Sequence, residues 1–394
     1  MKKKLYPALI LSVGIAMLAT ILSCSPPSFV KELRKAEKQL DSGLYAHAVK
    51  TCTAMLSRDP LLAQAYLYRG IAYHKQGNSG LALADFSSAI QTRSGYAEAF
   101  YNRGLVYEDL ADTDKAISSY TNAIDLNPRY AEAYERRAPL LESQMDFSSA
   151  AQDYRKLVEL KPKHVQAHFR LAVLYLDEGQ FHKSTQHCAT AIKLGMKTPA
   201  IYLTRGIGHL FMGCYDDAIN DLDSSVKLDK SQVEPYIYRA VAYTHKGIFD
   251  KALDDCSAAI ERDPENIKAL NSTAFVYLQM NKPETAMEYC RKALDIDPYD
   301  AGTYINLGLA LDKKGSFSDA IAQFDKAISL KPNLPEAYFN KAEILEKTGM
   351  VSRALEVYRV FIYGVQGAPQ TDITLAQKKI RELELKLRTM EKKE

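Results

Sequence analysis

The sequence predicts an all-α protein: a right-handed superhelical solenoid of about ten helix-turn-helix repeats of 34 residues, with a C-terminal capping helix. Three observations predict this fold. Apolar residues recur three and four positions apart, as in Ala82, Phe86 and Ala89, which indicates a buried helical stripe. When residues 29–368 are divided into ten frames of 34 residues, the eighth place of each frame is always Gly or Ala. The twentieth place is Ala in nine of the ten frames. Six prolines are separated only by multiples of 34: Pro60, Pro128, Pro162, Pro264, Pro298 and Pro332.

The repeat register runs without insertion through residues 29–368. Gly stands at the fifteenth place in seven frames, where a turn between two helices needs a flexible residue. One helix pair cannot bury its apolar stripe alone, so neighbouring pairs are expected to stack. The ten frames are 29–62, 63–96, 97–130, 131–164, 165–198, 199–232, 233–266, 267–300, 301–334 and 335–368.

This pattern resembles the tetratricopeptide repeat, a helix-turn-helix of 34 residues with small residues where its helices touch and Pro at the end of its second helix. The resemblance covers residues 29–368 and implies a scaffold that binds other proteins. In that family the inner face of the superhelix is formed by the first helix of each repeat, and places five and nine are among those facing the groove.

Places five and nine are largely apolar in this chain, which predicts a groove that binds a partner peptide or helix. The alternative is that these side chains pack against the next repeat. The family's carboxylate clamp for C-terminal peptides is incomplete around both Asn102 and Asn306. The candidate groove residues are Tyr101, Leu105, Phe169, Val173, Leu203, Ile207, Ile237, Val241, Ile305 and Leu309.

Charged residues at two places of the repeat occur together. Arg stands at the seventh place in five frames, and four of these frames have Asp at the twenty-third, whereas the fifth has Ser119. The frames without this Arg never have Asp there. This co-occurrence predicts structural ion pairs between the two helices of a repeat, rather than a phosphate-binding stripe. The predicted pairs are Arg69 with Asp85, Arg137 with Asp153, Arg205 with Asp221 and Arg239 with Asp255.

The N-terminus is typical of a secretory signal over residues 1–23: three lysines follow Met1, residues 5–22 are apolar, and Ser23 precedes Cys24. Residues 21–24 resemble a bacterial lipobox, which implies that Cys24 becomes the lipidated first residue of the mature protein. Residues 24–28 would then form a short proline-rich tether to the membrane. An uncleaved helical anchor and a cleaved soluble form are the alternatives.

Ser25 after the lipidated Cys resembles lipoproteins sorted to the outer membrane. We therefore expect a location in a bacterial cell envelope, at the outer rather than the inner membrane, facing the periplasm or the cell surface. The chain has 51 Lys and Arg against 48 Asp and Glu, and removal of the signal with its three lysines leaves 48 against 48. Because no basic surplus remains, nothing indicates nucleic acid as a partner.

No catalytic or cofactor motif is present in the sequence. It has no P-loop, nucleophile elbow, dinucleotide-binding glycine run or Cys-x-x-Cys pair, and the repeats leave no stretch for a catalytic domain. His164 and His168 have the spacing of a metal pair, but His168 stands at the fourth place, which is aromatic in most frames. We therefore expect no enzyme activity, catalytic residue, metal or cofactor.

Four cysteines, Cys52, Cys188, Cys256 and Cys290, occupy the twenty-fourth place, where other frames have Phe, Tyr or Leu. They are expected to act as small core residues. Cysteines of adjacent repeats should lie one helix-packing distance apart, roughly 9–10 Å, which is too far for a disulfide. Cys214, in a helix-start turn, is the remaining candidate for a reactive thiol.

Residues 369–394 depart from the repeat and end in a charged tail. Thr374 and Gln377 have the spacing of a capping box. The apolar steps of Ala376, Ile380, Leu383, Leu387 and Met390 predict a helix that covers the last repeat. A homodimer paired through residues 371–392 is the alternative.

These features together predict a membrane-anchored scaffold or adaptor that binds other proteins of the cell envelope, with the membrane contacted through lipid on Cys24. The alternatives are a surface adhesin, or a ligand-binding component that holds a small hydrophobic molecule in the groove.

Overall fold

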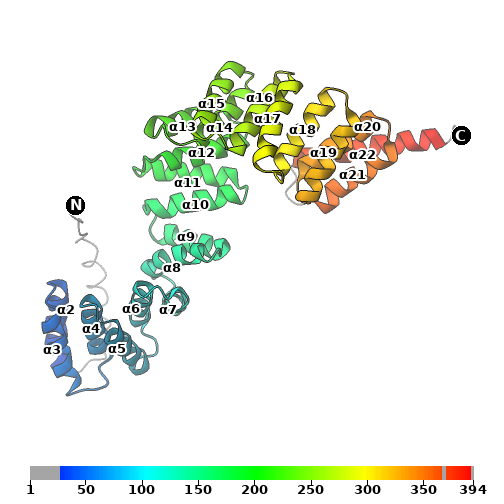
Figure 1. Cartoon of the computed structure of the whole chain (residues 1–394). Helices are drawn as coiled ribbons and strands as arrows, with labels where there is room; N and C mark the ends of the chain where they lie inside the picture. The colour runs from blue at the N-terminus through cyan, green and yellow to red at the C-terminus, as the bar shows by residue number, and fades with distance from the viewer. Residues whose placement is uncertain (1–26, 366–369, 392–394) are drawn as a thin grey trace. The chain divides into compact units, whose positions relative to one another are not determined.

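All the secondary-structure elements in the described part of the chain are α-helices, so the predicted fold class is confirmed. The computed structural model describes residues 27–365 and 370–391. The signal segment, Cys24 and the first residues of the tether therefore lie outside the described residues. The chain divides into two units, Met1–Leu174 and Tyr175–Glu394, and within each unit consecutive helices pack side by side in chain order (Figure 1).

The N-terminal unit is a stack of helix pairs. Its helices are α2 (Pro27–Asp41), α3 (Tyr45–Leu56), α4 (Ala63–Lys75), α5 (Ser79–Thr92), α6 (Ala97–Asp109), α7 (Thr113–Leu126), α8 (Ala131–Ser143) and α9 (Phe147–Leu160), and α10 (Val165–Asp177) contains the boundary between the units.

The C-terminal unit continues the same alternation and ends in one longer helix. Its helices are α11 (Phe181–Lys193), α12 (Pro199–Phe211), α13 (Tyr215–Leu228), α14 (Glu234–His245), α15 (Phe249–Arg262), α16 (Ile267–Gln279), α17 (Pro283–Ile296), α18 (Ala301–Lys313), α19 (Phe317–Leu330), α20 (Pro335–Lys347), α21 (Val351–Gly364) and α22 (Gln370–Glu391).

The helices follow the 34-residue frames closely. The first helix of a repeat begins at the first place of its frame in α4, α6, α8, α10, α12, α16, α18 and α20. Helix α14 begins one residue later, and α2 begins at Pro27, two residues before its frame. The predicted tether over residues 24–28 is therefore too long at its C-terminal end, because its last two residues belong to the first helix.

The fifteenth place, in the turn between the two helices, has the same backbone conformation in every repeat. The seven glycines there have φ between 71° and 80°. The three frames without Gly use the same left-handed conformation, at Ala111 (φ 58°), Met145 (φ 62°) and Asn281 (φ 57°). The turn geometry thus belongs to the repeat and is kept even where the residue is not Gly.

The eighth and twenty-fourth places share one packing space between the two helices of a repeat. A Cβ added to Gly104 would lie 2.6 Å from Tyr120, and one added to Gly70 would lie 2.7 Å from Phe86. A Cβ added to Gly206 would lie 2.9 Å from Leu222, and one added to Gly308 would lie 2.8 Å from Phe324. The four frames with Cys at the twenty-fourth place all have Ala at the eighth. A small thiol side chain leaves room for the Ala methyl group, although Ala138 and Ala342 also lie in frames that have Tyr at the twenty-fourth place.

The four cysteines at this place are buried and free of disulfide bonds. Burial raises the pKa of the thiols of Cys52, Cys188 and Cys290 to about 12 and that of Cys256 to about 11. A thiol with so high a pKa is protonated at neutral pH and reacts poorly. Cys214, directly before α13, is half-buried.

Helix α22 occupies the place of a first helix of an eleventh repeat. Continuing the frames from residue 369 places Ala376 at the eighth place, where it is fully buried in the cluster that contains Tyr358 and Phe361. Leu383 stands at the fifteenth place, where other frames turn, and is also buried. The helix therefore continues past the usual turn and covers the last repeat, as the apolar spacing predicts.

Two predictions for this tail need correction or restriction. Thr374 lies inside α22 and donates a hydrogen bond to the carbonyl of Gln370 (2.8 Å), so the predicted capping box is wrong. Ala376 and Leu383 contact the last repeat of the same chain. A homodimer through residues 371–392 would have to use the other face of α22, where Leu375 and Leu385 are exposed.

Candidate functional site

The four predicted ion pairs are present, and each joins the two helices of one repeat through two hydrogen bonds. Arg Nε lies 2.8 Å from one carboxylate oxygen in every pair, and the terminal nitrogen lies 2.5–2.8 Å from the other. The carboxylates of Asp85, Asp153, Asp221 and Asp255 are buried. In frame 97–130, which has this Arg but no Asp, Arg103 donates to the hydroxyl of Ser119 (3.3 Å).

Three of these arginines also contact the preceding repeat. The Nη1 of Arg69 lies 3.1 Å from the Thr53 hydroxyl, and that of Arg137 lies 2.8 Å from Thr121. The same atom of Arg239 lies 2.5 Å from a carboxylate oxygen of Asp223. Because each guanidinium joins three helices, these arginines hold repeats together and are not available to bind phosphate.

His164 and His168, which end the fourth frame and begin the fifth, make structural contacts. Nε2 of His168 lies 3.0 Å from the carbonyl oxygen of Pro162. Tyr304 and Tyr338, at the same place of their frames, donate to the carbonyls of Pro298 and Pro332. His168 thus substitutes for the tip of a tyrosine. Among the described residues no group of His, Cys, Asp and Glu has a metal-binding arrangement.

The candidate groove residues are mostly half-buried. Tyr101, Leu105, Phe169, Val173, Leu203, Ile207, Val241, Ile305 and Leu309 each keep part of their surface exposed. Ile237 is buried with Tyr236 and Ala259, so its place in the predicted groove is wrong.

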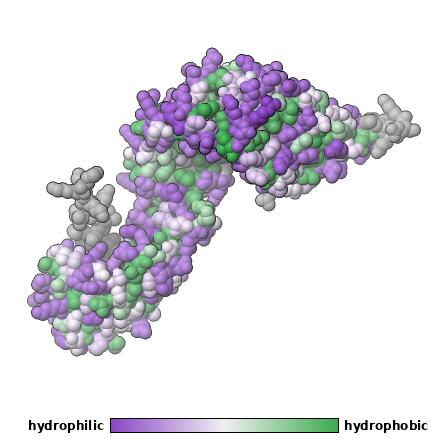
Figure 2. Space-filling view, in the orientation of Figure 1, coloured by the Kyte–Doolittle hydropathy of each residue, from purple (hydrophilic) through white to green (hydrophobic). Residues whose placement is uncertain are grey.

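Both interpretations of the apolar strip apply in part, because its side chains also contact neighbouring helices. Leu203 and Val241 pack against the cluster around Leu222, and Ile305 and Leu309 pack against the cluster around Phe324. The view in Figure 2 shows hydrophobic residues interspersed among hydrophilic ones on the visible face of each unit.

A set of polar contacts between successive repeats was not predicted. Glu108 accepts a hydrogen bond from Tyr120 of its own repeat (2.7 Å) and pairs with Arg136 of the next (3.2 Å). One repeat later, Glu142 forms a pair with Arg170, whose Nη2 lies 2.5 Å away. The recurring signal is Glu at the twelfth place with Arg at the sixth place of the next frame, and it occurs only at these two pairs.

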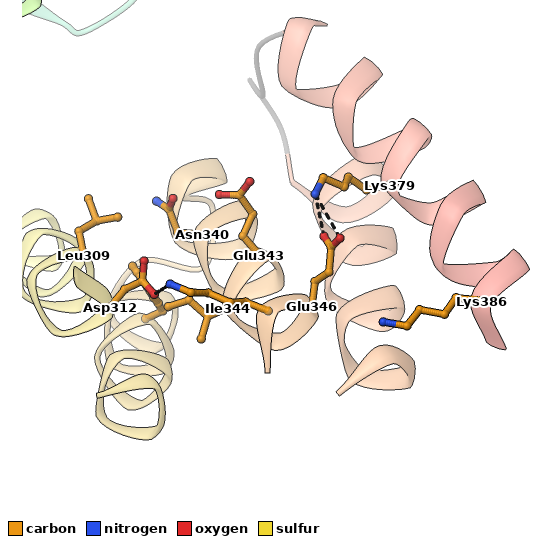
Figure 3. Close-up of a pocket in the computed structure, with 10 residues that line it drawn as sticks. Leu309, Asp312, Asn340, Glu343, Ile344, Glu346, Lys379 and Lys386 are labelled. Carbon is orange, nitrogen blue, oxygen red and sulfur yellow. Dashed lines mark hydrogen bonds and ion pairs between the residues drawn. The ribbon is translucent and has the colours of Figure 1, made fainter. Parts of the chain in front are cut away.

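The C-terminal end of the first-helix face holds a pocket of about 430 Å³ (Figure 3). It is formed mainly by α18, α20 and α22, and Leu309 is the one candidate groove residue in its wall. Two ion pairs frame it: Lys347 with Asp312 (2.9 Å) and Lys379 with Glu346 (3.0 Å). Its lining residues are Leu309, Asp312, Phe324, Asn340, Glu343, Ile344, Glu346, Lys347, Lys379 and Lys386.

None of the helices in the described ranges is long and apolar enough to cross a membrane. The geometry defines a class of protein: a solenoid of stacked helix pairs whose repeats are joined by ion pairs and small-residue contacts.

Models of the tetratricopeptide repeat match the sequence in this same register. One matches residues 97–130, which are one complete frame, and a second matches residues 33–97 and 136–197. A third, described as the N-terminal ARM repeat of tetratricopeptide repeat protein 21, matches residues 172–367. The chain is a tetratricopeptide repeat protein. Families of such repeat scaffolds are generally non-catalytic and bind protein partners.

One solved structure supports the fold. The crystal structure of yeast Tom70 is similar over 92% of this chain and 96% of its own, with 16% identity and a TM-score of 0.52. That of YrrB, described as a TPR protein with an unusual peptide-binding site, covers 51% of this chain and 100% of its own, with 24% identity and a TM-score of 0.42. At these identities the likeness concerns the fold alone. No curated protein matches the sequence.

Proposed function

We propose that this protein is a membrane-anchored scaffold of a bacterial cell envelope, and that it binds a partner polypeptide on the face formed by the first helices of its repeats. The observation that carries the proposal is the set of half-buried apolar side chains at places five and nine. Side chains that keep apolar surface exposed while their bases are fixed by packing can receive an apolar peptide at little cost in ordering.

The anchoring part of the proposal is supported by the N-terminal sequence alone. Three lysines, an apolar run and Cys24 in lipobox context precede the first helix. Cys24→Ala should abolish incorporation of radiolabelled palmitate and release the protein from membranes once the signal is cut. Equal labelling of the variant and the wild type would contradict lipidation.

The binding part can be tested by site-specific photo-crosslinking in intact cells. A photoreactive amino acid at Leu105, Phe169 or Ile207 should give discrete crosslinked products. The control positions Leu126 and Leu228 are exposed at the ends of second helices, and should give none of these products. The same products from all five positions, or no products from the first three, would contradict the peptide-binding proposal.

One alternative is a component that holds a small hydrophobic molecule in the groove. The pocket at the C-terminal end of the groove does not favour it, because six of its ten lining side chains are charged. A surface adhesin differs from a periplasmic scaffold in location. Protease added to intact cells would degrade an adhesin and spare a periplasmic protein.

A further inference from the structure

Three carboxylates line the pocket at the C-terminal end, and that of Glu343 differs from the other two in its contacts. Asp312 and Glu346 are neutralised by Lys347 and Lys379 at 2.9 Å and 3.0 Å. Lys386 also has an interaction partner within the chain. Glu343 forms no hydrogen bond or ion pair within bonding distance among the described residues, although Lys379 acts on it electrostatically.

Glu343 lies close to groups that suit a cation with an apolar stem. Asn340 lies one turn before it on α20, and in Figure 3 both side chains project to the side on which Lys379 of α22 lies. An Asn side-chain oxygen can accept hydrogen bonds from a cationic donor. Leu309 of α18 and Ile344 of α20 provide apolar surface in the same pocket.

We propose that this pocket accepts the cationic side chain of a lysine or arginine from the partner polypeptide, with Glu343 as its counter-ion and Leu309 as the wall for its aliphatic stem. The inference rests on the proposed function, because the partner is taken to lie along the face formed by the first helices. This pocket is at the C-terminal end of that face.

The charges around the pocket favour a cation over an anion. An anion would have to compete with Asp312 or Glu346 for a lysine that is already paired, and would meet the unpaired carboxylate of Glu343. A cation gains a counter-charge without breaking either ion pair. A neutral apolar ligand would leave Glu343 desolvated and unpaired, which is unfavourable.

The proposal also predicts the sign of a pH effect. Glu343 is exposed to solvent, but partial desolvation at the pocket wall raises the pKa of its carboxyl above 4.5. Glu346, Asp312 and Asp372 add to the rise, whereas Lys379 opposes it. The other charged groups that line the pocket are Lys347 of α20 and Lys386 of α22. Because a cation binds the ionised carboxylate, affinity should fall as the pH decreases through this raised pKa.

The test is a peptide titration of the full chain in detergent, followed through the methyl NMR signals of Leu309 and Ile344. The probe is an acetylated, amidated pentapeptide, Ala-Leu-Arg-Leu-Ala, and its control has citrulline in place of arginine. Citrulline keeps the shape of arginine and removes the charge. The arginine peptide should bind about tenfold more tightly, as expected for a hydrogen-bonded charge pair.

Variants of the pocket separate charge from shape. Glu343→Gln should reduce the affinity for the arginine peptide to that of the citrulline peptide, and Glu343→Asp should retain part of the difference. Glu356→Gln, at an exposed position of α21, is the matched control and should bind like the wild type. Equal binding of both peptides by the wild type, undiminished binding by Glu343→Gln, or no methyl shift with the arginine peptide would each overturn the proposal.

The outcome can be separated from that of the proposed function. If the crosslinks at Leu105 and Phe169 form but the arginine peptide does not bind, the pocket proposal is rejected. The proposed scaffold function is then retained. Arginine-selective binding without crosslinks would support the pocket and reject the extended peptide surface.

Discussion

Arg137 and Asp153 form a two-point ion pair between the two helices of one repeat, with Nε 2.8 Å from Oδ2 and Nη2 2.7 Å from Oδ1. The aspartate side chain is only 3% exposed and the arginine 16%. A carboxylate in such a position is costly to bury unless its partner is present.

Replacement of Arg137 by Met should therefore destabilise its repeat by about 3–5 kcal/mol, because it leaves a buried, unpaired carboxylate. Arg103→Met is the matched control, since Arg103 occupies the same place and contacts only the neutral hydroxyl of Ser119 across the helix pair. It should cost about 1 kcal/mol. Amide hydrogen exchange of α8 and α9 measures the effect locally, which is appropriate because repeat proteins open repeat by repeat.

The double variant Arg137→Met with Asp153→Leu distinguishes the cost of an unpaired charge from the loss of packing. Removal of both charges should recover a large part of the lost stability. If the double variant is as unstable as Arg137→Met, the penalty comes from packing around the guanidinium and not from Asp153.

A second prediction concerns pH and Asp221. Burial alone would raise the pKa of this carboxyl, but hydrogen bonds from His209 and Arg205 outweigh it and lower the pKa below 3.8. Because the folded-state value lies below the unfolded one, Asp221 contributes stability that is present above the unfolded pKa and lost as the pH falls through the folded pKa. Asp221→Asn should therefore destabilise the repeat at pH 7, by a margin that narrows below pH 3.8.

Denaturant unfolding at pH 7 and at pH 3 checks this prediction. Asp319→Asn, at an exposed position of α19, serves as the control and should show little difference at either pH. A stability loss in Asp221→Asn that is equal at both pH values would mean that its hydrogen-bond geometry matters and its charge does not.

The fold could be predicted because the repeat imposes one period on every element. The ion pairs could also be predicted, because Asp appears at place twenty-three only where Arg stands at place seven. That places eight and twenty-four share one packing space required coordinates.

The pocket could not be predicted, because its walls come from two repeats and from a helix outside the repeat frames. Lys379 of α22 reaches Glu346 of α20 only through the packing of the last helix. Ile237 was placed in the groove by its repeat position, yet contacts around Tyr236 and Ala259 bury it. Such contacts depend on local side-chain size, which the period does not encode.

A third prediction uses the turn at place fifteen. Met145 adopts a left-handed φ of 62° although it is not Gly, and its side chain is 77% exposed, so little packing would be lost on replacement. Met145→Gly should stabilise the repeat by about 1 kcal/mol, because a side chain in this conformation costs roughly 1–2 kcal/mol. Gly77→Ala, at the equivalent place with φ 80°, should destabilise by a similar amount. A shift of both variants in the same direction in thermal unfolding would contradict the argument.

The last prediction concerns α22 as the cap of the solenoid. Leu383 is 3% exposed and belongs to the cluster around Tyr358 and Phe361, whereas Leu385 on the same helix is 65% exposed. Leu383→Ala should cost about 2–5 kcal/mol locally, because it leaves a cavity between the cap and the last repeat. Leu385→Ala should change stability by no more than about 0.5 kcal/mol. Hydrogen exchange should show faster opening of α21 and α22 in Leu383→Ala only. Equal protection in the two variants would mean that α22 does not cover this core in solution, and its apolar face would then be open to pair with a second chain.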